Sequence, residues 1–232
     1  MKRFLALFVV ATFIMTTFSV VAVASPVSAK ATSPPAAVLS LPMTVRMSVS
    51  VPTAGASCYF FVFVNSLKFR GWCIDTALSI TNTQVYTGKV YSSYGALPEG
   101  VAPDHPENLD LVNWIINQNY VGRQSPGGYG AYTYGDVQRS IWTLLENVLI
   151  DNELGVWHSD RVNEIVSAAL AKGDGFVPAA GQKVAVVLDP VDSFGDHIAQ
   201  AVIIEASMPY RLVNQPSSPA TAGPALGCAC AW

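Results

Sequence analysis

Hydrophobic residues alternate with polar or small residues in several short stretches of the chain, and this period of two predicts β-strands. The alternation is clearest from Val45 to Val51. The run 59–64 is apolar throughout, which is typical of a strand covered on both faces, and Asn65-Ser66 after it fits a tight turn. Further strands are expected at 68–75, 84–91, 183–189 and 197–206.

A helical period replaces the alternation in the middle of the chain and predicts three helices. The first lies at about 105–119, the second begins at Asp136, and the third runs over 159–172. Asp136 is the expected N-cap of the second helix, and Ser159 that of the third. Strands on both sides of a helical insertion predict an α+β fold with a β-sandwich or barrel core.

The N-terminus has the pattern of an export signal. An uncharged apolar run from Phe4 to Val23 follows Lys2-Arg3, and Ala22-Val23-Ala24 places small residues where a signal peptidase cuts. A membrane anchor is the alternative, because the run approaches the length that spans a bilayer. We expect a mature protein that is secreted or held at the cell surface, without a membrane span. The expected divisions are a signal peptide at 1–24, a flexible lead-in at 25–40, one domain at 41–214 and a Pro/Ser/Ala/Gly-rich tail at 215–232.

Charge and motif content exclude several functions. Removal of Lys2 and Arg3 with the signal leaves 11 basic against 16 acidic residues, and the basic residues form no stripe, so nucleic acid is not an expected partner. The chain has no Gly-x-Ser-x-Gly elbow, phosphate loop or His-Glu-x-x-His pair. No cofactor or metal is therefore predicted.

Four cysteines bear on both stability and chemistry: Cys58, Cys73, Cys228 and Cys230. In an exported protein an even number of cysteines indicates disulfides, and four allow three pairings. A bond between Cys58 and Cys73 would join two neighbouring predicted strands.

Two short strings carry the most specific signal. The first is Gly71-Trp72-Cys73-Ile74-Asp75, a cysteine between large apolar residues on a predicted strand. The second is the segment 134–142, in which Gln138 stands near the start of a helix and Trp142 follows one turn later. This spacing puts the two side chains on one helix face. A carboxamide beside a buried tryptophan is unusual, because burial costs a few kcal/mol unless its hydrogen bonds are satisfied.

Together the strings resemble the thioester domains of Gram-positive bacterial surface adhesins. In that family a cysteine lies between an aromatic residue or leucine and an apolar residue, and a Thr-Gln-x-Ala-apolar-Trp string follows much later. Cys73 matches the first string, with Trp72 before it, and Gln138, Ile141 and Trp142 match the second.

The resemblance implies that residues 41–214 form a thioester-like domain. In it the Cys73 thiol would condense with the Gln138 carboxamide, and the product would couple covalently to an amine on a surface or protein partner, a lysine or a polyamine. This is adhesion or crosslinking by single-turnover chemistry rather than enzymatic catalysis. Val137 and Ser140 depart from the family string, which has threonine and alanine there, and no sortase-type anchor is found.

The resemblance also implies supporting roles. Trp72, Ile141 and Trp142 would keep water from the acyl group. Unpaired backbone N–H groups at the helix start, from Asp136 to Arg139, would stabilise the oxyanion. Two alternatives stay open: a non-covalent secreted β-rich binding or structural domain with Cys73 in a disulfide, and a hydrolase or transglutaminase-like enzyme that uses Cys73.

Overall fold

The computed structural model describes residues 41–50, 61–151 and 155–207. The predicted signal peptide, lead-in and Pro/Ser/Ala/Gly-rich tail lie outside these residues, as do Cys58, Cys228 and Cys230.

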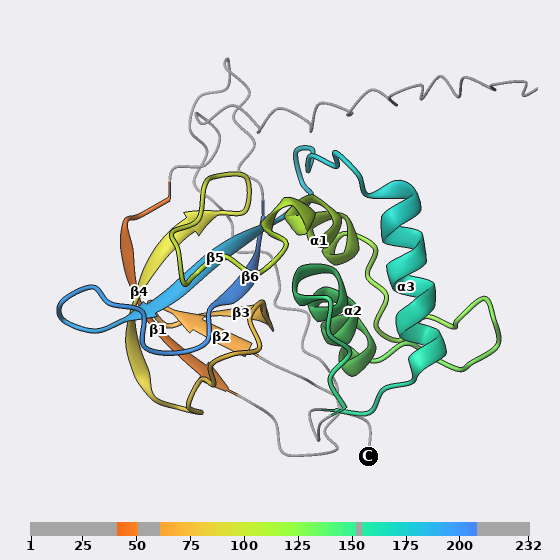
Figure 1. Ribbon diagram of the computed structural model, residues 1–232, viewed down its shortest axis with the longest axis horizontal. Helices are drawn as coiled ribbons and strands as arrows, with labels where there is room; N and C mark the ends of the chain where they lie inside the picture. Colours follow the sequence, from red (N-terminus) through yellow and green to blue (C-terminus); the bar gives the residue numbers. More distant parts are fainter. Residues whose placement is uncertain (1–40, 51–60, 152–154, 208–232) are drawn as a thin grey trace, which may run out of the picture.

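Within the described residues, six antiparallel strands close into a barrel, which is one of the two core architectures expected from the sequence (Figure 1). Around the barrel the strands follow the order β1-β2-β3-β6-β5-β4. Their bounds are β1 Thr44–Ser50, β2 Phe61–Val64, β3 Leu67–Cys73, β4 Val85–Ser92, β5 Lys183–Val191 and β6 Val202–Ser207.

The alternation of side chains along the strands builds the barrel wall. Val45, Met47 and Val49 of β1 are buried, as the period of two predicts. β2 alternates between half-buried and buried positions, so the expectation of a strand covered on both faces is wrong. Asn65 and Ser66 both have positive φ and form the tight turn to β3, a conformation whose twist matches that of the flanking strands.

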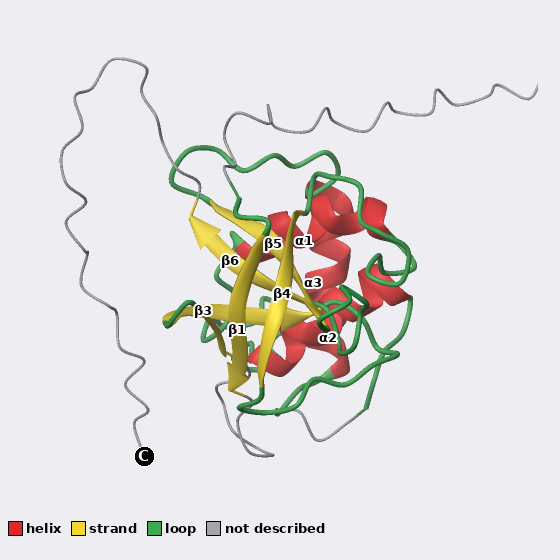
Figure 2. Cartoon of the chain, turned by 90° about the vertical axis from the view of Figure 1, so that its left-hand side faces the viewer, coloured by secondary structure: helices red, strands yellow, loops and turns green. Residues whose placement is uncertain are grey.

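The helices lie between β4 and β5 in the chain and gather on one side of the barrel (Figures 1 and 2). α1 packs against β5 and α2 against β3, while α3 contacts both of these helices. Within the described part of the chain, no helix has the length and apolar character needed to cross a membrane. The helical bounds are η2 Pro106–Asn108, α1 Leu109–Ile116, α2 Tyr134–Glu146 and α3 Ser159–Lys172.

Several predicted boundaries of helices and strands differ from those in the structure. α2 begins two residues before Asp136, with Thr133 as its N-cap. The N-cap of α3 is His158 rather than Ser159, because the His158 imidazole accepts the Asp160 N–H. The last strand begins at Val202 rather than at residue 197.

Candidate functional site

Cys73 and Gln138, which lie 65 residues apart in sequence, are in direct contact in the structure. The backbone N–H of Cys73 donates to Gln138 Oε1 over 2.9 Å. In return Gln138 Nε2 donates to the Cys73 carbonyl oxygen over 2.8 Å. Cys73 is 3% exposed and Gln138 is fully buried. The two residues that the motif singled out thus form one buried unit.

The end of β3 explains why a side chain binds the backbone at this point. Among the described residues, β2 pairs with β3 from Leu67 to Arg70, and β6 pairs with β3 from Gly71 to Cys73. The Ile74 N–H points toward β6, where it donates to Ala201. Because successive residues of a strand direct their backbone groups to opposite edges, the N–H and C=O of Cys73 face away from β6. The Gln138 carboxamide binds this edge as a neighbouring strand would.

This pairing satisfies a polar group that would otherwise be costly to bury. Both ends of the Gln138 carboxamide are hydrogen-bonded, and both bonds go to one residue. The carboxamide is therefore held against the backbone of Cys73. The arrangement fixes the orientation of the Gln138 carboxamide relative to Cys73.

The surroundings of the pair are apolar and closed to solvent. Trp72 and Trp142 are 1% and 2% exposed, and Ile74 and Ile141 are fully buried. The Trp72 ring stacks on Tyr134, the first residue of α2, with their centroids 5.6 Å apart. The predicted supporting residues on both strings therefore lie in the core between β3 and α2.

A buried carboxylate adjoins this aromatic stack. Glu205 of β6 accepts the Trp72 Nε1–H over 3.0 Å, and its other oxygen lies 3.8 Å from Arg70 Nη1. Burial raises the pKa of Glu205, and the Arg70 charge and the Trp72 hydrogen bond offset this only in part.

Replacement of this carboxylate should alter how stability depends on pH. A folded-state pKa above the unfolded value of about 4.3 means that stability is greatest below that value and is lost as pH rises through the folded pKa. Glu205→Gln keeps an acceptor for Trp72 but does not ionise. We expect the stability of the wild type relative to Glu205→Gln to fall between pH about 4 and neutrality, measured by urea unfolding. A difference that is flat or rises with pH would contradict the assignment.

Asp136 has a different role from the predicted N-cap. Its Oδ2 accepts the Thr133 N–H over 2.7 Å and Arg161 Nε over 2.6 Å, and its Oδ1 accepts the His158 N–H over 2.8 Å. With Thr133 it forms a capping box, and with Arg161 it joins the start of α2 to α3. Asp136 therefore fixes the position of the helix that carries Gln138.

The predicted oxyanion donors at the helix start are not available. The Asp136 N–H bonds to Thr133 Oγ1, and the Val137 N–H to the Thr133 carbonyl. Gln138 and Arg139 lie beyond the first turn, where backbone N–H groups have partners within the helix. The donor that reaches Gln138 Oε1 is instead the backbone N–H of Cys73. Sequence alone carries no signal for this contact.

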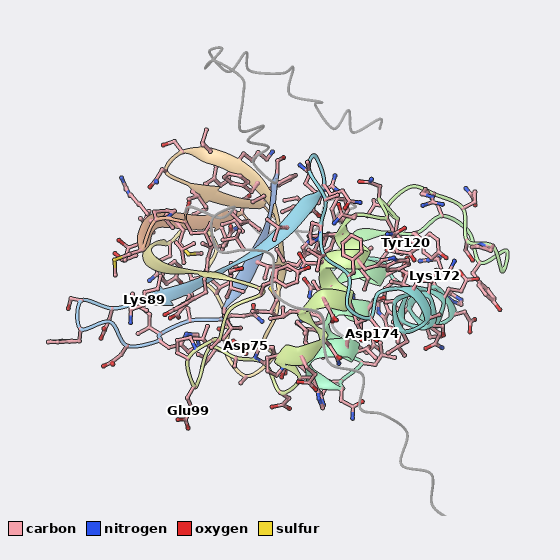
Figure 3. The ribbon with its side chains drawn as sticks, turned by 90° about the horizontal axis from the view of Figure 1, so that it is seen from above. Asp75, Lys89, Glu99, Tyr120, Lys172 and Asp174 are labelled. Atoms are coloured by element: carbon pink, nitrogen blue, oxygen red, sulfur yellow. The ribbon has the colours of Figure 1, made fainter. Side chains whose placement is uncertain are left out.

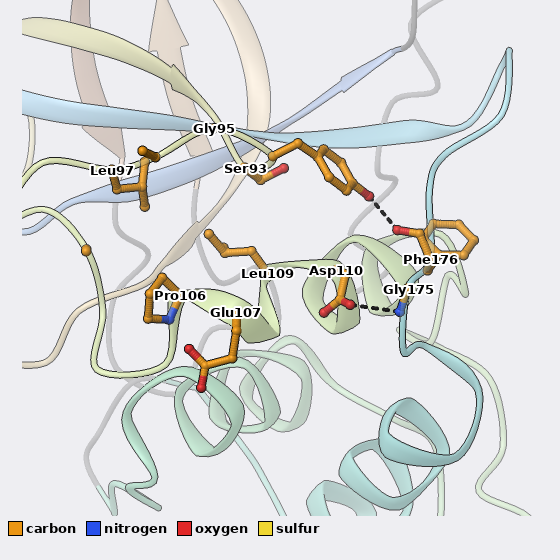
Figure 4. Close-up of a pocket in the computed structure, with 12 residues that line it drawn as sticks. Ser93, Gly95, Leu97, Pro106, Glu107, Leu109, Asp110, Gly175 and Phe176 are labelled. Carbon is orange, nitrogen blue, oxygen red and sulfur yellow. Dashed lines mark hydrogen bonds between the residues drawn. The ribbon is translucent and has the colours of Figure 1, made fainter. Parts of the chain in front are cut away.

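Two clefts lie outside the pair, and neither Cys73 nor Gln138 lines them. One, of about 420 Å³, lies between residues 93–97 and the start of α1, where Asp110 accepts the Gly175 N–H (Figure 4). The other, of about 670 Å³, lies between the loop after α1 and α3; Tyr120 and Lys172 mark it in Figure 3. Among the described residues no cluster of three metal-ligating side chains occurs.

Comparison with known proteins gives matches of structure only. No protein-family model matches the chain, and no curated protein matches it. Similar solved structures include the N-terminal domain of the Streptococcus pyogenes pilus tip adhesin Cpa, at 10% identity and a TM-score of 0.45, covering 74% of this chain and 97% of that one. They also include the N-terminal thioester domain of a Clostridium perfringens surface protein, at 10% identity and a TM-score of 0.43, covering 69% and 97%.

Proposed function

We propose that Cys73 and Gln138 form an internal thioester, through which the protein couples once to a primary amine on a surface or protein partner. The observation that supports this most directly is the pair of hydrogen bonds by which one residue holds the carboxamide of the other. The two bonds hold the carboxamide of Gln138 on the residue whose thiol would react with it.

Formation of the thioester exchanges one bond for another. The Cys73 sulfur attacks the carboxamide carbon of Gln138, the C–N bond breaks, the thiol proton passes to the departing nitrogen, and ammonia leaves. The Cys73 N–H already donates to the oxygen that becomes negative in the tetrahedral intermediate, so it acts as one preorganised donor. Loss of ammonia also breaks the bond from Gln138 Nε2 to the Cys73 carbonyl.

Coupling to the partner reverses the exchange with a different amine. The nitrogen of a lysine or polyamine attacks the thioester carbon, the C–S bond breaks, and its proton passes to sulfur, leaving a γ-glutamyl amide and the Cys73 thiol. The acyl group must be shielded from hydrolysis until the amine arrives, and Trp72, Ile141 and Trp142 supply that shield. Because the product stays on the protein, the reaction is covalent adhesion or crosslinking and not turnover.

Intact-mass measurement of the secreted protein tests this proposal. The untreated protein should be lighter than its reduced sequence by the mass of one ammonia molecule, and methylamine should then add to it once. As a control, Gln118→Ala should show the same mass deficit and the same single addition of methylamine. Gln118 lies outside the pair, with its Nε2 bonded to the Trp114 carbonyl. A protein of full mass, or a deficit of hydrogens only, as two disulfides would give, contradicts the proposal.

A further inference from the structure

The indole nitrogen of Trp142 is an exception in the core. Trp142 is 2% exposed. Among the described residues, its Nε1 is the one buried side-chain nitrogen or oxygen atom that lacks a hydrogen-bond partner. Native proteins leave very few such groups unsatisfied, and those that occur call for an explanation such as a catalytic role.

The position of Trp142 relates this nitrogen to Gln138. Trp142 follows Gln138 by four residues in α2, so the two side chains share a helix face. Side chains in a helix lean toward its N-terminus, so the Trp142 ring covers the turn that contains Gln138. Tyr134, one turn earlier on the same face, stacks on Trp72 of β3. This face of α2 is therefore the one that meets Cys73.

The carbonyl oxygen of Gln138 has capacity for a second donor. A carbonyl oxygen can accept two hydrogen bonds, and Gln138 Oε1 accepts one from the Cys73 N–H. During attack by sulfur this oxygen gains a full negative charge, and oxyanion sites commonly supply two donors. The N–H groups of Asp136 to Arg139 do not serve, because they are already bonded at Thr133 or within the helix.

We propose that the Trp142 Nε1–H is the second donor to the acyl oxygen, in the tetrahedral intermediate and in the thioester. This inference rests on the proposed function and makes Trp142 a catalytic residue of the same site. As the C–N bond of Gln138 breaks and the C–S bond forms, the oxygen keeps the Cys73 N–H and gains the indole N–H. The Trp142 Nε1–H, which has no partner among the described residues while Gln138 is an amide, thus gains the acyl oxygen as its acceptor during the reaction.

Trp142→Phe tests the role of the N–H, because it keeps an aromatic ring and removes the donor. We expect methylamine coupling, followed by mass spectrometry, to slow by about 10²–10³-fold, the usual loss when one oxyanion donor is removed. The carbonyl stretch of the thioester should also move to higher frequency in the infrared. Trp114→Phe is the matched control, since Trp114 lies on α1 near Tyr120, and it should couple at the wild-type rate.

A second measurement keeps the test decisive if Trp142→Phe does not fold. In ¹⁵N-labelled wild-type protein, the Trp142 indole proton should resonate further downfield in the thioester than in Cys73→Ala, which cannot form it. Equal coupling rates in folded Trp142→Phe, or an indole resonance that is the same in both proteins, overturns this inference alone. Absence of the ammonia deficit from the wild type would overturn the proposed function itself.

Discussion

Cys73→Ala is expected to abolish covalent uptake of amines while leaving the fold in place. The substitution removes the sulfur, but the backbone N–H and C=O that hold Gln138 remain. Without a thiol the carboxamide stays an amide, which amines do not attack under mild conditions. Incorporation of a fluorescent primary amine, read on a denaturing gel, should fall to background.

Two controls accompany this variant: its unfolding transition, which checks that it is folded, and Gln118→Ala, which checks amine uptake by a variant outside the pair. Cys73→Ala should unfold cooperatively, and Gln118→Ala should take up the amine as the wild type does. Uptake by Cys73→Ala at the wild-type level would show that the amine reacts elsewhere and that the pair is not a thioester.

Asp136→Ala should produce the largest loss of stability among single substitutions near the site. Asp136 is fully buried and makes an ion pair with Arg161, which is 8% exposed. Removal of one partner leaves a buried charge without its counter-charge, which costs about 3–5 kcal/mol. The capping box of α2 is lost at the same time. Urea unfolding measures the change in the free energy of unfolding.

Asp174→Ala is the matched control, because Asp174 is exposed after the end of α3 (Figure 3). Its effect should stay within about 0.5 kcal/mol, as is usual for surface positions. If Asp136→Ala were equally mild, the ion pair to Arg161 would not be what fixes α2 against α3.

The barrel strands were predictable because their signals are local. Alternating burial in β1 follows directly from the alternating residues Val45 to Val49, and the turn at Asn65-Ser66 follows from its residue types. Closure of the strands into a barrel was not predictable in the same way. It depends on pairing of β1 with β4 and of β3 with β6, which joins segments far apart in the chain.

The candidate site shows the same division between local and distant information. The strings around Cys73 and Gln138 singled out two residues that the structure brings into contact, and the four-residue spacing placed Trp142 on the helix face of Gln138. A local signal was also available for the start of α2, since Thr133 and Asp136 have the spacing of a capping box. The Asp136–Arg161 ion pair and the Cys73 N–H donor depend on tertiary packing, so no local pattern indicates them.

The most direct test of the thioester is to locate the methyl group after the protein has reacted with methylamine. Tandem mass spectrometry of the digested protein should find the methylamide on the side chain of Gln138 and a thiol at Cys73 that an alkylating reagent modifies only after the reaction. Methylamide at another glutamine, or a Cys73 peptide linked to a second cysteine, would contradict the account.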